Sequence, residues 1–102
     1  MTPLPTRVQV GLRSFEMERQ ADSSGVSGTG VVLQGVIFAT GVTVAHWLTP
    51  APAGSVSIFQ RFGDFESIHV LSHPGNGTIL RFSDGEARHY TEGTITVETA
   101  AE

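Results

Sequence analysis

Cysteine is absent from the 102 residues, and lysine is absent as well, because all six basic residues are arginines. The lack of cysteine excludes disulfide frameworks, thiol catalysis and cysteine-ligated zinc. It leaves the redox compartment of the protein open. Arginine without lysine indicates a GC-rich coding bias, which concerns the origin of the chain and not its mechanism.

Charge is also scarce, at 16% of residues against about 25% in a typical globular protein. The formal net charge of −4 disfavours a phosphate backbone as partner, so nucleic acid is an unlikely ligand. The first residues lack the basic start and apolar run of a signal peptide, and no later segment approaches the roughly 18 apolar residues of a membrane span. We therefore expect a soluble protein of the cytoplasm, with no membrane contact.

Hydrophobic residues make up 39% of the chain, enough for a core, and the length suits one domain over residues 1–102. Twelve glycines and five prolines interrupt the chain at short intervals, which favours many brief strands over a few long helices. Residues 1–6 and 99–102 have little to bury and are expected to be frayed ends.

Alternating and β-rich segments predict the strands. The first has a bulge near Arg13 and Ser14 or is divided into two short strands, and Gly35 marks a bulge or sharp bend in the second. The expected strands cover 7–18, 31–38, 42–48, 55–60, 78–82 and 87–90, with a further edge strand or a loose segment at 94–98. Asp64 is a plausible N-cap for one short helix. In that helix apolar residues recur every third position, at Phe62, Phe65, Ile68 and Leu71. This order predicts a mostly β fold, either a small SH3-like barrel or a strongly bent antiparallel sheet with one short helix.

One set of motifs resembles a group of known sequences. The motifs are Ser27-Gly28-Thr29-Gly30-Val31-Val32, Gly35-Val36-Ile37-Phe38, Gly41-Val42-Thr43-Val44, Trp47-Leu48 and Phe65-Glu66-Ser67-Ile68-His69. They resemble short uncharacterised proteins of actinobacteria and their phages over roughly residues 27–82. That group usually has a Ser-Asp-Gly turn and an Arg where this chain has Ala39-Thr40-Gly41 and His46. The resemblance implies a phage setting and no particular activity.

Candidate catalytic and metal-binding motifs have simpler interpretations. His69 and His73 have a metal-like spacing, but Pro74 turns His73 away from helical geometry, so we expect no metal site. The Gly25–Gly30 stretch precedes a strand and contains no basic residue, which is typical of a connecting loop and not of a phosphate-binding loop. No Gly-x-Ser-x-Gly elbow is present. We therefore predict neither a cofactor nor enzymatic activity.

Side-chain alternation gives the sharpest prediction. If Val42, Val44 and Leu48 face the core, then Trp47 faces outward, and Phe59 does the same on the next strand. The residues expected on this outer surface are Trp47, Phe59, Ala45 and Ser57, with Ala45 paired to Phe59 and Leu48 to Val56. Exposed aromatic pairs often mark binding sites. A bulge at His46, or a covering segment, would instead bury the indole.

These expectations favour a non-catalytic protein-binding or assembly module, a phage accessory protein by the resemblance, which meets a protein partner or a second copy. The alternatives are a virion structural component, a nucleic-acid-associated small β-barrel and a small hydrolase or metal protein. Self-association through sheet edges is one available mode.

Overall fold

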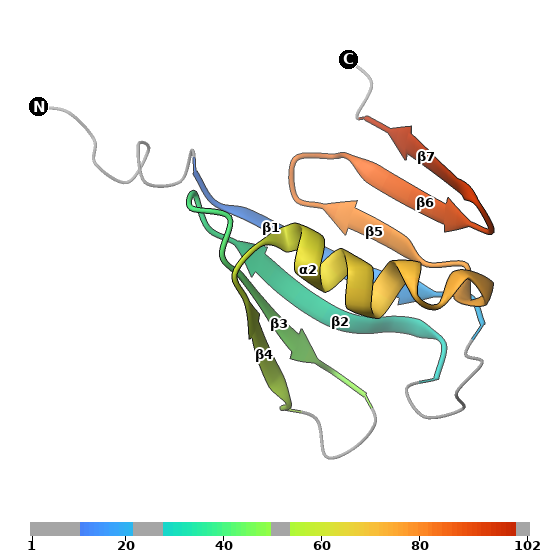
Figure 1. The fold of residues 1–102 in the computed structure, drawn as a ribbon, viewed down its shortest axis with the longest axis horizontal. Helices are drawn as coiled ribbons and strands as arrows, with labels where there is room; N and C mark the ends of the chain where they lie inside the picture. Colours follow the sequence, from blue (N-terminus) through green and yellow to red (C-terminus); the bar gives the residue numbers. More distant parts are fainter. Residues whose placement is uncertain (1–10, 22–27, 50–53, 100–102) are drawn as a thin grey trace, which may run out of the picture.

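The computed structural model describes residues 11–21, 28–49 and 54–99, and within them a single antiparallel sheet dominates (Figure 1). Its strands are β1 (Arg13–Arg19), β2 (Gly30–Ile37), β3 (Thr43–Trp47), β4 (Val56–Phe59), β5 (Ile79–Phe82), β6 (Ala87–Thr91) and β7 (Thr94–Glu98). Their order across the sheet is β4-β3-β2-β1-β5-β6-β7. The predicted lead-in at 1–6, the start of the first predicted strand and residues 100–102 of the predicted tail lie outside the described residues.

A short helical segment lies across one face of the sheet (Figure 1). It begins as α2 (Phe62–Glu66), continues as the π-helical η1 (Ser67–Leu71) and is followed by the 3₁₀ turn η2 (Pro74–Asn76). We call the side of the sheet beneath it the helix face and the opposite side the open face. The molecule therefore has two layers over much of its area, with one covered and one uncovered side of the sheet.

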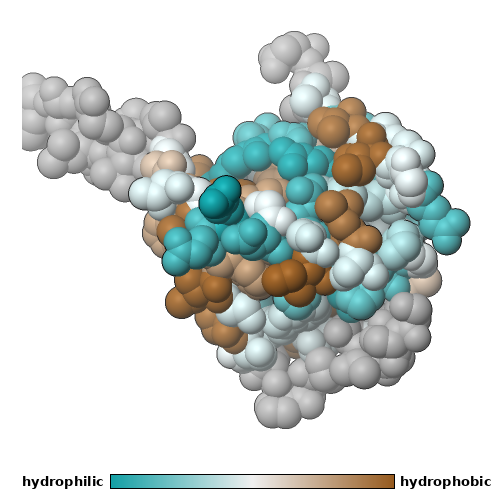
Figure 2. Space-filling view, in the orientation of Figure 1, coloured by the Kyte–Doolittle hydropathy of each residue, from teal (hydrophilic) through white to brown (hydrophobic). Residues whose placement is uncertain are grey.

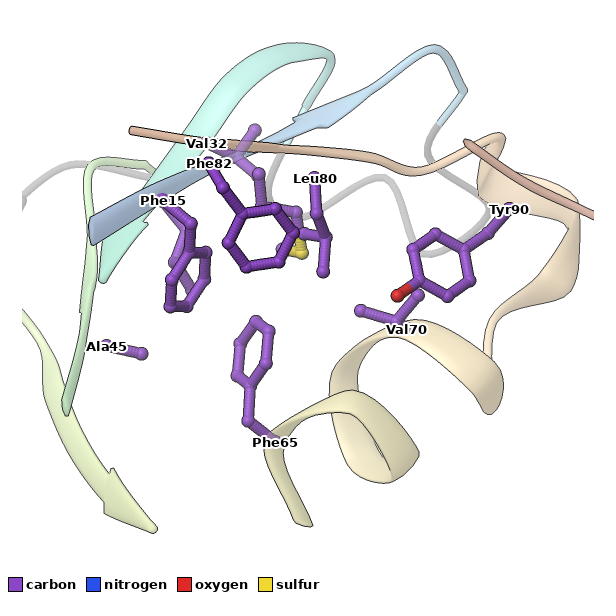
Figure 3. Packing of buried hydrophobic residues seen from close by; sticks show 10 residues of the cluster. Phe15, Val32, Ala45, Phe65, Val70, Leu80, Phe82 and Tyr90 are labelled. Carbon is purple, nitrogen blue, oxygen red and sulfur yellow. The ribbon is translucent and has the colours of Figure 1, made fainter. Parts of the chain in front are cut away.

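The core fills the space between the helix face and α2–η1. Phe65 and Val70 point from the helical segment toward Phe15, Leu80 and Phe82 (Figure 3). Burial of these apolar side chains is the main force that holds the helix on the sheet, because two of its ten residues are almost fully removed from water. Tyr90 completes the cluster at the η1 end, where its hydroxyl donates a hydrogen bond to Glu66 at 2.6 Å.

The mostly β class and the single short helix are confirmed, but the barrel is wrong. Among the described residues β4 and β7 form the two ends of the sheet and do not pair with each other. A barrel needs that closure, together with strongly tilted strands. Of the two predicted architectures, the one with an antiparallel sheet and one short helix is the one that the chain adopts, and the sheet is not closed.

Neither of the two predicted bulges is present, since the register is regular at Ser14 and at Gly35. The register shifts between Met17 and Glu18, which pair with Leu33 and Val31 and leave Val32 as the extra residue. The bulge lets two neighbouring residues, Val32 and Leu33, both be buried. Gly35 is not bulged and instead lies beneath the ring of Phe15.

The helix does not begin as predicted. It starts at Phe62 after Arg61, and no side chain caps it, so Asp64 lies in the first turn and not at the N-cap. Phe65 is buried as expected, whereas Ile68 and Leu71 are about half exposed. The i to i+5 bonding of η1 explains this difference, since the wider turn brings Val70 inward in place of the residues spaced by three.

Candidate functional site

The predicted orientation of the central hairpin is reversed in the structure. Thr43 and Ala45 are fully buried on the helix face, and Trp47 and Phe59 are partly buried against the same core. Val44 and His46 lie on the open face. Trp47, Phe59, Ala45 and Ser57 do share one face, as predicted, but it is the face that the helix covers. The predicted outward position of the indole and phenyl rings is therefore wrong, and the alternative of a covering segment is the one that the structure has, with the helix as that segment.

The strand pairing is offset as well. Ala45 pairs with Ser57, and Phe59 pairs with Thr43, so the expected pairing of Ala45 with Phe59 is wrong by two residues. In the observed register the small side chains of Thr43 and Ala45 take the fully buried positions of β3, next to the aromatic core. The Thr43 hydroxyl is satisfied in this position, since it donates to the Gly41 carbonyl at 3.1 Å.

Trp47 and Phe59 meet through a third ring rather than on an outer surface. The His69 imidazole lies 5.3 Å from the Trp47 ring and 5.7 Å from the Phe59 ring, measured between centroids. The Arg19 guanidinium lies 5.3 Å from the indole on another side. Burial, followed by the nearby charges of Arg19 and His73, lowers the pKa of His69 below its usual 6.5. Trp47 and Phe59 therefore support the helical segment through their contacts with His69.

The lowered pKa of His69 predicts a pH dependence of stability. The unfolded chain binds a proton near pH 6.5 and the folded chain only at lower pH, so the contribution is complete above pH 6.5 and is lost as pH falls through the folded pKa. We expect the urea midpoint to fall on acidification through this window, with a smaller fall in His69→Gln. An NMR titration should place the His69 midpoint below 6.5, and a midpoint above that value would contradict the burial argument.

Two cross-strand rows organise the open face. The first is aliphatic over three strands and runs Ile58, Val44, Val36, Ser14 from β4 to β1. The second is mainly polar and runs Val56, His46, Gln34, Glu16, Arg81 from β4 to β5. Side chains paired in this way lie close enough to form one continuous surface. The aliphatic residues at the β4 end are strongly exposed, Val56 at 55% and Ile58 at 73%.

A hollow of about 580 Å³ lies over the middle of this face. Its lining comes from β1, β2, β3, β5 and the residue after β5, and includes Val36, Val44, His46, Gln34, Arg81 and Ser83. Several polar groups here already have partners. Gln34 donates to Glu16 at 3.3 Å, Arg81 pairs with Glu18 at 3.2 Å, and the Ser83 hydroxyl accepts a bond from the Ser14 amide at 3.2 Å.

Charge is divided unequally across the sheet. Residues 23–60, which include β2, β3 and β4, contain no Asp, Glu or Arg. On the other side, Arg13 joins Asp84 at 2.8 Å and Glu86 at 2.6 Å. The hydrogen bond from Arg13 lowers the pKa of Asp84, and that from Arg88 lowers the pKa of Glu86. The neutral segment is the sequence signal that could have directed attention to the β4 half of the open face.

Comparison with known families gives a match over most of the chain. A family model described as Acb5 phage protein matches residues 12–84. The chain belongs to this phage protein family. The matched residues run from the residue before β1 to the turn after β5, so they contain the helical segment, the hollow and both rows of the open face, while β6 and β7 lie beyond them. The predicted phage setting is thereby confirmed, whereas the actinobacterial origin stays a prediction.

The comparison finds no similar protein among the curated proteins and no similar solved structure. In the described part of the chain, no helix has the length and apolar character to cross a membrane. The same residues hold no group of three or more His, Asp or Glu side chains placed to share a metal ion, and this includes His69 and His73.

Proposed function

We propose that this phage protein is a non-catalytic binding module that docks a protein partner on the open face of its sheet. The observation that carries the proposal is the aliphatic row, which crosses three strands and continues past the hollow to the strongly exposed Ile58. A stripe of this kind exceeds the single exposed apolar residues that are normal on a soluble protein.

The dimensions of the open face suit a protein partner better than a small molecule. Strands spaced by about 4.8 Å and rising about 3.3 Å per residue give seven strands of about five residues a flat extent of roughly 30 by 16 Å. This flat extent, about 480 Å², is more than half of the roughly 800 Å² that each partner contributes to a standard interface. A small molecule in the hollow would leave Val56 and Ile58 uncovered.

The charges of the face favour a partner of mixed polarity over nucleic acid. Its arginine, Arg81, is paired with Glu18, and Glu16 lies beside it in the second row. A phosphate backbone would meet these carboxylates and a net charge of −4. A protein with an apolar strip and a polar margin complements the two rows, and partner side chains can displace the exposed ion pair at little cost.

The non-catalytic part of the proposal is supported by how the polar side chains are used. In the hollow Glu16 accepts from Gln34, and Ser83 accepts from a backbone amide, so these groups hold the sheet surface together. Nucleophilic catalysis would instead need a serine held by its base. We assign the protein to the accessory proteins made during infection, with a virion component as the alternative.

Site-specific photo-cross-linking in infected cells tests this function. A cross-linking residue at Gln34, in the hollow, should give a discrete protein adduct that mass spectrometry identifies. The matched control places it at Ile68, on the helical segment and 53% exposed, where we expect no adduct.

A second substitution locates the contact. Val44→Arg puts a charge in the middle of the aliphatic row and should reduce the Gln34 adduct by about tenfold, as for an interface contact of about 1.4 kcal/mol. An adduct with a particle protein would assign the virion role. No protein adduct, or equal adducts from Gln34 and Ile68, would overturn the proposal.

A further inference from the structure

We infer that two copies of this chain associate through the β4 edge, by antiparallel pairing of β4 with β4 about a twofold axis at Ser57. This goes beyond the proposed function, because it rests on the backbone of an edge strand, and of the open face it uses only Val56 and Ile58 at the β4 end. The partner is a second copy of the chain.

The backbone of β4 is arranged for such pairing. The Trp47 amide donates to the Ser55 carbonyl at 2.8 Å, and hydrogen-bonded pairs alternate along an antiparallel ladder. Ser57 and Phe59 therefore direct their backbone groups toward β3, and Val56 and Ile58 direct theirs to the outer edge. Among the described residues no strand lies beyond β4.

A twofold axis at Ser57 pairs the outward backbone groups of Val56 and Ile58 with those of the second copy. It places Val56 opposite Ile58 of the second copy, and Ile58 opposite Val56, as two hydrogen-bonded pairs that exchange four backbone bonds. Cross-strand partners project from the same face of a sheet, so the exposed aliphatic side chains of both copies meet on the open side. The contact is isologous, and it closes at two copies.

The distribution of charged residues favours self-association at the β4 edge over the β7 edge. The chain carries a net charge of −4, so most approaches of two copies meet repulsion. The strand β4 lies in the segment 23–60, which lacks charged Asp, Glu and Arg side chains, whereas β7 ends at Glu98 and follows Glu92. Edges that must stay single are commonly protected by charges, prolines or bulges, and Val56–Phe59 contains no charged residue and no proline.

Cysteine cross-linking tests the register directly, because the natural chain contains no cysteine. In the proposed dimer the two Ser57 residues face each other as a non-hydrogen-bonded pair with Cα atoms about 4.5 Å apart, within the disulfide range. Mild oxidation of Ser57→Cys should convert most of the protein to a covalent dimer. Thr96→Cys, at the centre of β7, is the matched edge control and should stay monomeric.

Sedimentation equilibrium of the unmodified chain, up to about 1 mM, should show a monomer–dimer equilibrium, since even a millimolar dissociation constant populates the dimer there. Ile58→Lys, at a side chain that is 73% exposed, should keep the monomer fold by circular dichroism and weaken dimerisation at least about tenfold. A monomer at all concentrations, or a dimer that resists Ile58→Lys and leaves Ser57→Cys unlinked, overturns the inference. Either result leaves the Gln34 cross-linking test of the open face unaffected.

Discussion

Gly35→Ala is expected to lower the free energy of unfolding by about 3 kcal/mol, a large part of the total stability of a small domain. A Cβ at this position would lie 2.3 Å and 2.5 Å from two ring carbons of Phe15. The ring has no room to move aside, because its centroid is within 5.3 to 5.8 Å of the rings of Phe62, Phe65 and Phe82. The pairing of Phe15 with Gly35 across β1 and β2 is therefore a close fit that a methyl group breaks.

Gly63→Ala is the matched control for this substitution. Gly63 lies inside α2, and nothing is within 4 Å of the Cβ that it would gain. The same change should there stabilise the protein by about 0.5–1 kcal/mol, because alanine loses less conformational entropy in a helix. Urea unfolding followed by circular dichroism measures both, and Gly35→Ala with wild-type stability would contradict the Phe15 contact.

Phe65→Ala should cost about 3–5 kcal/mol. Phe65 is fully buried and its ring contacts those of Phe15, Phe59, Phe62 and His69, so truncation leaves a cavity between the sheet and the helix. Because few other side chains hold α2–η1 to the sheet, we also expect loss of helical signal before the sheet unfolds.

Ile68→Ala, three residues further along the helical segment and 53% exposed, is the control and should cost under about 1 kcal/mol. Chemical denaturation monitored through the fluorescence of Trp47 reports on the contact between the indole and η1. Equal costs for Phe65→Ala and Ile68→Ala would show that the helix is not held by the aromatic cluster.

Local patterns predicted the strands well and their orientation poorly. Alternation and turn residues located six strands and left 94–98 open between an edge strand and a loose segment, since each signal is contained in a few neighbouring residues. Orientation depends on what covers the sheet. Thr43 and Ala45 are less apolar than Val42 and Val44, yet they face the core, because the rings above them leave only a small space. Patterns of hydrophobicity do not contain that volume constraint.

The predicted aromatic surface lies on the side of the sheet that the helix covers. Figure 2 shows the helix-covered side, where hydrophobic residues form separate patches among polar ones. The rings that were expected outside are partly buried beneath the helix. The candidate site on the open face was missed because its aliphatic row draws on three strands, and only the register between β2, β3 and β4 brings Val36, Val44 and Ile58 into line.

The central position of β1 has a consequence for folding order. Strands β1 to β4 each pair with the next strand along the chain and can form hairpins early. The pairing of β1 with β5, which places Phe15 opposite Phe82, joins segments far apart in the sequence. Closing so long a loop is slow compared with hairpin formation. We therefore expect the pairing of β1 with β5 to be a late step of folding, after the hairpins of β1 to β4 have formed.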